Sequence, residues 1–227
     1  MSSSSDFLKY VPIFSELPDE TIEKISQVGS KKLYKRDTVV MMEEDAGSAL
    51  FIIVEGKVKV GRTSNDGREV ILSILAESDF FGEMAILDGQ SRSATVTALE
   101  DSELFIVQRN QFLDLLQQHP EIAISLLQEL TRRLRGADIK IKSLSLKDAE
   151  GKVATVILQL ADDLGKIKNG IVEIEKIPLQ QDLANMAGTS RETISRTLHS
   201  FSKKGLIELD GSKLRILDYA KFKEMYV

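Results

Sequence analysis

Hydrophobic residues change their spacing along the chain, and the first change marks a β-rich region. Between residues 38 and 107 they occur in short apolar or alternating runs, a pattern typical of β-strands. Turns rich in glycine and aspartate separate the runs, as expected for antiparallel hairpins. We therefore predict an antiparallel barrel or sandwich. The predicted strands cover residues 39–42, 50–54, 57–60, 70–75, 94–99 and 104–107.

Two short helical pieces are predicted ahead of this region, at residues 7–14 and 21–25. Pro12 and Pro18 punctuate them. The serine run at residues 2–5 predicts an irregular tail.

Helical spacing returns near Gln111, and after Pro120 it continues without another proline to about residue 146. In this long helix, apolar residues follow each other at alternating steps of three and four residues. Such a seam packs against the same seam of a second chain in a coiled coil, so we expect a homodimer. The alternative is a helix that lies on its own domain. The seam comprises Leu127, Leu130, Leu134, Ala137, Ile141 and Leu144.

The third part of the chain begins after a break at residues 146–148. Asp148 can cap the free N–H groups of a second helix, predicted over residues 153–164. Residues 170–177 predict a hairpin arm or a strand. Beyond them, residues 179–198 predict two helices joined by a glycine turn, and residues 206–216 predict a small β-wing.

The helix pair at residues 179–198 carries the most specific pattern in the chain. Gly188 permits a tight turn, and Ile194 and Leu198 bury the inner face of the second helix, which leaves its polar residues outward. Arginine can bind guanine O6 and N7, and glutamate can accept from cytosine N4. We therefore predict that the second helix reads double-stranded DNA through Arg191, Glu192, Ser195 and Arg196. The predicted phosphate contacts are Gln181, Ser190, Thr193, Lys203 and Lys204.

Two other interpretations of this face stay open. Glu192 can form a capping box with Thr189, and the arginines can belong to a solvated surface. The charge distribution favours DNA binding. From residue 148 onward 12 Lys and Arg balance 12 Asp and Glu, whereas the whole chain has a net charge of -5, so a DNA backbone would repel this part least.

The composition excludes several classes of site. The chain has no cysteine, which excludes disulfides, thiolate zinc sites, iron–sulfur clusters and cysteine nucleophiles. Only His119, beside a proline, and His199, in the DNA-reading helix, could ligate haem, so neither haem nor a metal is expected. The chain has no phosphate-binding loop, zinc-protease motif or paired-glycine dinucleotide turn, so no enzyme is expected. No signal peptide or membrane span is evident, and we expect a cytoplasmic protein with no membrane partner.

The run Ser-Arg-Glu-Thr-Ile-Ser-Arg at residues 190–196 closely resembles the recognition helix of the catabolite activator protein family of CRP/FNR regulators. The resemblance extends over nearly the whole chain. It implies an α+β fold with a cyclic-nucleotide-binding β-barrel (jelly roll; residues 1–118), a long dimerisation helix (119–147) and a winged helix-turn-helix (148–227). It also implies a palindromic TGTGA-like operator and RNA polymerase as a partner. Ser195 stands where the best-known member has glycine, which leaves the half-site open.

A second informative cluster consists of Phe81-Gly-Glu-Met-Ala85 and Arg92-Ser-Ala94. Glycine allows close backbone approach, a carboxylate can accept from ribose hydroxyls, and arginine beside serine can bind phosphate. The cluster resembles the phosphate-binding cassette of cyclic-nucleotide-binding domains. That resemblance implies ribose contacts from Gly82 and Glu83, phosphate contacts from Arg92, Ser93 and the Ala94 amide, and ligand contacts from Ser73, Met84 and Ala85. The alternative is an internal ion pair between Glu83 and Arg92.

The long helix departs from the helix of relatives that respond to cyclic AMP. Arg133 matches their arginine, but Ala137 and Asp138 stand where they offer a threonine-serine pair to adenine. An ionised carboxylate only accepts hydrogen bonds, so Asp138 suits the N1–H and N2–H donors of guanine. We expect a cyclic nucleotide effector, cyclic AMP or cyclic GMP. A different guanine nucleotide such as cyclic di-GMP, or no nucleotide at all, is the alternative, and Asp138 could instead pair with Lys142.

Overall fold

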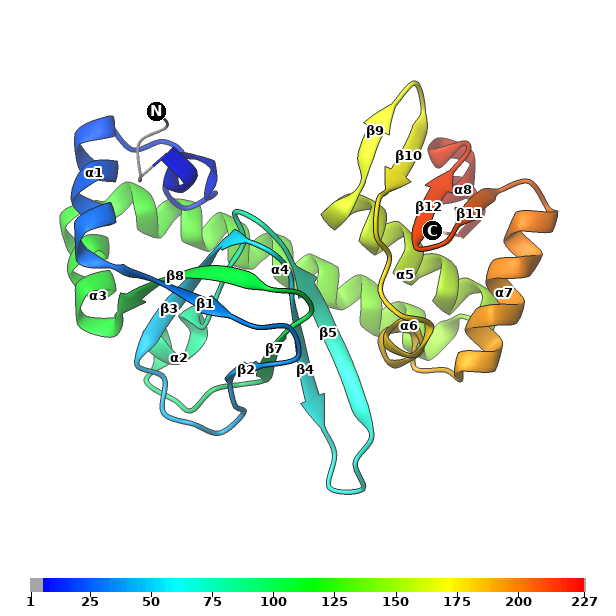
Figure 1. The fold of residues 1–227 in the computed structure, drawn as a ribbon, viewed down its shortest axis with the longest axis horizontal. Coiled ribbons are helices and arrows are strands. Elements are labelled where there is room, and N and C mark those ends of the chain that lie inside the picture. The colour runs from blue at the N-terminus through cyan, green and yellow to red at the C-terminus, as the bar shows by residue number, and fades with distance from the viewer. Residues whose placement is uncertain (1–5, 227) are drawn as a thin grey trace. The chain divides into compact units, whose positions relative to one another are not determined.

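The structure, a computed structural model, describes residues 6–226 (Figure 1). The serine run at residues 2–5 lies outside the described residues. The described chain forms two compact units, one comprising the residues up to Arg62 with Leu72–Arg135, and the other Thr63–Ile71 with the residues from Gly136 onward.

Two four-stranded sheets contain the strands of the first unit, as the short apolar runs predicted, and residues 63 and 69–71 of these sheets belong to the second unit. Both sheets contain antiparallel pairs of strands. One sheet has the order β1(Ser30–Tyr34), β8(Ser102–Gln108), β3(Ala49–Glu55), β6(Phe80–Phe81). The other has the order β2(Val39–Met41), β7(Thr95–Ala98), β4(Val58–Thr63), β5(Glu69–Leu75).

Strand β3 supplies two cores at once, because successive side chains of a strand point to opposite faces. Leu50 and Ile52 pack in a cluster with residues of the surrounding helices. Phe51 and Ile53 pack in a second cluster with residues of the other sheet, including Val96. The sheet that contains β3 therefore lies between a helical layer and a second sheet, as in a β-sandwich.

The helices of the first unit include a 3₁₀ helix at Asp6–Tyr10 (η1), α1(Asp19–Val28) and α3(Arg109–Gln118). The first predicted helical piece is thus shorter than expected, because turns replace it from residue 11 onward. The second predicted piece, residues 21–25, is longer in the structure, where it forms α1. Helical structure near Gln111 is confirmed by α3.

Three elements near the sheets escaped the sequence pattern for physical reasons. Strand β1 has only one buried residue, Tyr34, so it shows no apolar alternation. Strand β6 has two residues. Helix α2(Glu83–Asp88) has six residues, too few to display a helical period, and both flanking glycines, Gly82 and Gly89, adopt left-handed conformations.

The second unit combines helices with a four-stranded sheet of order β11-β12-β10-β9. Its elements are α5(Ala149–Leu164), β9(Lys166–Lys168), β10(Ile171–Ile174), α6(Gln180–Ala187), α7(Arg191–Lys203), β11(Ile207–Asp210), β12(Lys213–Ile216) and α8(Tyr219–Tyr226). The predicted arm, helix pair and wing are confirmed, whereas β9 and α8 were not predicted. Asp148 caps α5 as expected, since its carboxylate accepts from the Gly151 N–H at 2.8 Å, but α5 begins four residues earlier than predicted, at Ala149.

Helix α4(Pro120–Leu146) confirms the predicted long helix and contributes residues to both units. Leu127, Leu134 and Ile141 are 64%, 64% and 63% exposed, and Leu144 and Ala137 are exposed as well. Leu130 differs, because it packs partly against the core of the first unit. Among the described helices, none is long and apolar enough to cross a membrane.

Candidate functional site

The turn between β6 and α2 requires a glycine. Gly82 has a φ of 87°, in the left-handed region that side chains disfavour. A Cβ atom at this position would lie 2.7 Å from Nη1 of Arg92 and 3.0 Å from the carbonyl oxygen of Ala49. The close backbone approach that the sequence predicted here is therefore present.

Arg92 is buried against main-chain oxygens of this turn. Its Nη1 donates to the Gly82 carbonyl and its Nη2 to the Ala49 carbonyl, both at 2.7 Å. The guanidinium also lies 5.7 Å from the ring centroid of Phe51. The alternative of a Glu83–Arg92 ion pair is wrong, because the two carbonyls hold this guanidinium and the carboxylate of Glu83 has another partner.

That partner is Arg133, on α4. Glu83 is 4% exposed, and its Oε1 lies 3.2 Å from Nη1 of Arg133. Burial raises the pKa of Glu83, and the charge of Arg133 offsets part of the rise. The carboxylate predicted to bind a ribose is thus tied to the long helix.

Arg133 is itself held at each of its nitrogens. Nε donates to Oε1 of Glu129 at 2.8 Å, and Nη2 donates to the carbonyl of Phe80 at 2.8 Å. The guanidinium carbon lies 4.5 Å from the centroid of the Phe80 ring, a cation–π arrangement. Sequence reasoning missed Glu129, although a glutamate four residues before an arginine is a recognisable helical pair.

Three residues of the cassette lie at a hollow of about 260 Å³. Arg92, Ser93 and Met84 line it, and Ser93 Oγ lies 3.6 Å from the Met84 sulfur. Arg62, also in the lining, pairs with Glu43 at 2.5 Å. The structure therefore brings predicted ligand residues from both halves of the cluster together at one hollow. Ala85 and Ala94 are buried and do not line this hollow. Ser73 is half-buried on β5.

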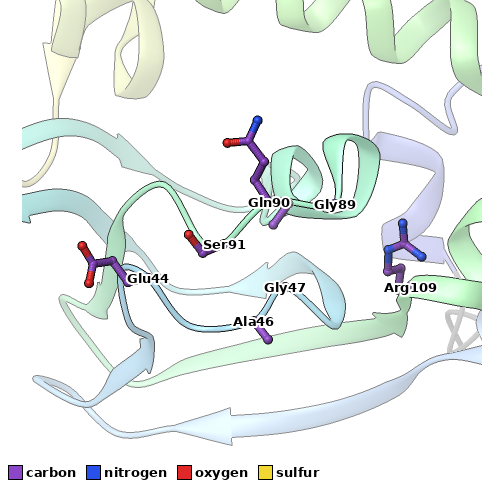
Figure 2. Close-up of a pocket in the computed structure, with 8 residues that line it drawn as sticks. Glu44, Ala46, Gly47, Gly89, Gln90, Ser91 and Arg109 are labelled. Atoms are coloured by element: carbon purple, nitrogen blue, oxygen red, sulfur yellow. The ribbon is translucent and has the colours of Figure 1, made fainter.

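A second hollow of about 430 Å³ lies on the neighbouring loops (Figure 2). Gln90 and Ser91 follow α2. Ser91 pairs with Ala46 on the loop that carries Glu44, the Gln90 side chain points away from that loop, and Arg109 stands at the start of α3. Glu44 lines both hollows, and its φ of 71° is left-handed although it is not a glycine. No sequence signal predicted this conformation.

Two predicted effector residues belong to the second unit. Ala137 and Asp138 are exposed on α4. The alternative ion pair between Asp138 and Lys142 is not formed among the described residues. Asp138 therefore presents an open carboxylate.

Helices α6 and α7 form the predicted helix-turn-helix. Gly188 ends α6 with a φ of 59°, the left-handed conformation expected of a glycine C-cap. Ile194 and Leu198 are buried, as predicted for the inner face of α7. The predicted base-reading residues are all exposed: Arg191, Glu192, Ser195 and Arg196.

The start of α7 differs in one respect from the capping alternative. Ser190, rather than Thr189, is the N-cap, because its hydroxyl accepts from the Thr193 N–H at 3.1 Å. Hydrogen bonds from the backbone N–H of Glu192 and from Ser190 hold the pKa of Glu192 below its ordinary value. Glu192 thus stays an ionised acceptor on the outward face.

The predicted phosphate contacts are distributed around this helix pair. Gln181 is exposed and donates to Asn185 at 3.1 Å, and Lys203 is exposed near the end of α7. Thr193 lies within 3.0 Å of the Ser190 hydroxyl. Lys204 is engaged differently, since it forms an ion pair with Glu150 at 2.7 Å.

Within residues 6–226, no group of three or more His, Asp or Glu side chains could hold a metal ion. The chemistry available at the two sites is hydrogen bonding and charge pairing. It suits recognition of a ligand and of DNA.

Comparisons with known proteins agree with this division. The model of the cyclic nucleotide-binding domain family matches residues 31–119, and that of the Crp-like helix-turn-helix domain matches residues 151–225. Over 218 residues the chain is 34% identical to the cyclic AMP receptor protein of Thermus thermophilus, covering 96% of this chain and 98% of that protein. The chain belongs to the CRP/FNR family.

Further relatives support the same family. This CRP/FNR protein is 32% identical to the CRP-like cAMP-activated global transcriptional regulator of Mycobacterium tuberculosis, over 94% of this chain and 95% of the relative. The structure of FixK2 from Bradyrhizobium japonicum shares the fold with a TM-score of 0.78 at 21% identity, covering 88% of this chain and 98% of FixK2. The family consists of transcription regulators, not enzymes, and the chain is a ligand-responsive DNA-binding regulator.

Proposed function

We propose that this protein is a homodimeric transcription regulator that binds a palindromic, TGTGA-like operator under the control of a cyclic nucleotide. The nucleotide ribose binds Gly82 and Glu83, and its cyclic phosphate binds Arg92, Ser93 and the Ala94 amide. In this proposal residues 1–118 sense, 119–147 dimerise and 148–227 bind DNA.

The observation that carries the proposal is the contact between Glu83 and Arg133. Glu83 belongs to the cassette and Arg133 to α4, so a ligand that engages Glu83 acts on a residue of the dimerisation helix. A shift in the pairing of the two long helices, passed on at residues 146–148, then changes the spacing of the two recognition helices. Half-sites about 34 Å apart, one turn of DNA, accept one spacing only.

Operator recognition rests on the outward face of α7. Arg191 and Arg196 supply guanidinium groups, and the ionised Glu192 supplies an acceptor, on one exposed side of the helix. Arginine pairs with guanine and glutamate with cytosine in the major groove. RNA polymerase is the partner through which such a regulator acts on transcription.

The open carboxylate of Asp138 favours cyclic GMP as a second candidate effector. It can accept from both N1–H and N2–H of guanine, whereas adenine offers a donor and an acceptor on the corresponding edge. Isothermal calorimetry with cyclic AMP and cyclic GMP decides between them. Substitution of Asp138 by Ser should reverse a preference for cyclic GMP, and an unchanged preference would remove Asp138 from base recognition.

Fluorescence anisotropy of a labelled TGTGA-containing palindrome tests the main proposal. Operator affinity is measured without nucleotide, with cyclic AMP and with cyclic GMP, on the full-length protein. We expect one nucleotide to raise the affinity for the palindrome more than for a scrambled duplex. Equal affinity in all three conditions would mean a regulator that binds DNA without a nucleotide.

A further inference from the structure

Glu129 is a buried carboxylate that two arginines share. Its side chain is 7% exposed, and it lies on α4 one turn before Arg133. Arg132 donates to both of its oxygens at 2.8 Å, and Arg133 donates to Oε1 at 2.8 Å. Burial raises the pKa of Glu129, but these hydrogen bonds outweigh it and hold the pKa below its ordinary value.

The two arginines differ in what else they touch. The side chain of Arg132 is 63% exposed, whereas that of Arg133 is 26% exposed and reaches Glu83 and Phe80. With Nε on Glu129, Nη1 on Glu83 and Nη2 on the Phe80 carbonyl, the planar guanidinium has one orientation. Glu129 is the only one of these three acceptors that belongs to the same helix as Arg133, so it fixes the guanidinium relative to α4.

Stability alone does not account for a carboxylate at this position. A well-packed apolar side chain is often as stabilising as a buried ion pair, because it avoids the cost of removing a charge from water. A carboxylate is needed if the direction of the Arg133 guanidinium matters. A bidentate or multiple hydrogen-bond arrangement supplies that direction.

We propose that Glu129 is a positioning residue of the effector response: it holds the Arg133 guanidinium rigidly to α4, so that displacement of Glu83 is transmitted to the helix. This inference rests on the proposed function. It assigns Glu129 no contact with the nucleotide. Loss of its charge should therefore weaken the response to the nucleotide more than the binding of the nucleotide.

The experiment measures two quantities on the full-length protein. One is nucleotide affinity, by calorimetry with cyclic AMP and cyclic GMP. The other is the coupling factor, the ratio of operator dissociation constants without and with saturating nucleotide. Coupling factors of about 5- to 150-fold are typical of allosteric proteins. For Glu129→Gln we expect a coupling factor below about threefold, with nucleotide affinity changed by less than about threefold.

Arg132→Ala is the matched control. It removes the other partner of the same carboxylate but leaves the Glu83–Arg133 contact, so its coupling factor should stay at the wild-type value. Glu129→Asp keeps the buried charge, and hence the fold, but withdraws the carboxylate from Arg133, so its coupling factor should also fall. Combining Glu129→Gln with Arg133→Ala should give no further loss beyond Arg133→Ala alone, because both act through one contact.

The outcomes separate this inference from the proposed function. A wild-type coupling factor of one for both nucleotides overturns the proposed function itself. A responsive wild type with equally responsive Glu129→Gln and Glu129→Asp variants overturns only the role of Glu129. An equal loss in Arg132→Ala, or additive losses in the double variant, overturns it too, because either indicates a general packing effect.

Discussion

In our proposal single side chains determine which bases the protein reads, and Arg191 is the clearest case. Its side chain is exposed at the first turn of α7. Arg191→Ala should cost about 1–3 kcal/mol of binding free energy on the specific operator and weaken discrimination at one base pair. Competition anisotropy with single-base operator variants measures this loss.

Lys203→Ala provides the control for Arg191. A lysine that contacts phosphate contributes equally on every sequence, so this variant should weaken specific and random DNA alike. If Arg191→Ala gave the same uniform loss, Arg191 would be a phosphate contact.

Glu44 shows a different residue-scale effect, since its backbone is strained. Its φ of 71° costs an L-residue roughly 1–2 kcal/mol relative to glycine. Glu44→Gly should therefore stabilise the protein by about 0.5–1 kcal/mol, after the extra chain entropy of glycine is subtracted. Urea unfolding measures the change. Glu44→Ala keeps the Cβ atom and should give no such gain, so equal gains would show that the strain is not the cause.

At the scale of elements, the periodic spacing of hydrophobic residues determined which helices and strands could be predicted from the sequence. The long helix α4, the helix pair α6–α7 and most strands have enough residues to show a period. Strand β6 and helix α2 do not, although Gly82, between them, and Glu83, at the start of α2, belong to the candidate site. Chemistry identified these residues where periodicity was uninformative.

Partners at the site were harder to predict than the site residues themselves. Glu83, Arg92 and Arg133 were all identified from the sequence, but the pairing of Glu83 with Arg133 spans 50 residues and depends on tertiary packing. Arg92 binds carbonyls, which have no residue-specific signature in a sequence. Only Glu129 left a local signal, through its helical spacing to Arg133.

Lys140 gives helix α4 a pH-dependent contact. Its Nζ donates to the Ile71 carbonyl at 2.7 Å, and burial lowers the pKa of Lys140 from 10.5 to about 8. Between about pH 8 and pH 10.5, Lys140 is protonated in the unfolded chain and largely deprotonated in the folded chain. The free energy of unfolding therefore rises with pH in this range. Urea unfolding from pH 8 to pH 10 should show this rise, and Lys140→Met should reduce it. Lys168→Met, at an exposed lysine of β9, is the control and should leave the wild-type slope unchanged.

At the scale of the whole molecule, the proposed dimer depends on the seam of α4. Leu134 is 64% exposed in the single chain, so a second chain has most of this side chain to cover. Leu134→Glu should yield monomers in sedimentation velocity and weaken operator binding by about a hundredfold or more, because two linked recognition helices bind far better than one. Its unfolding free energy, measured at a concentration where the wild type is also monomeric, should change little.

Gln128→Glu adds the same charge to an exposed position of α4 that lies off the seam. It should leave both the dimer and operator binding intact. If Leu134→Glu still formed dimers and bound the operator with undiminished affinity, the seam would not be the dimer interface.

The hydrogen bonds of Arg92 to two carbonyls have a consequence for genetics. Truncating this side chain deprives two main-chain oxygens of their donors in the folded state. A random screen for cells that no longer respond to the effector would thus recover Arg92 mutants partly because the protein is less abundant. Selections for altered inducer response in this protein need a parallel immunoblot, and Ser93, whose hydroxyl is exposed, is the cleaner position to mutate.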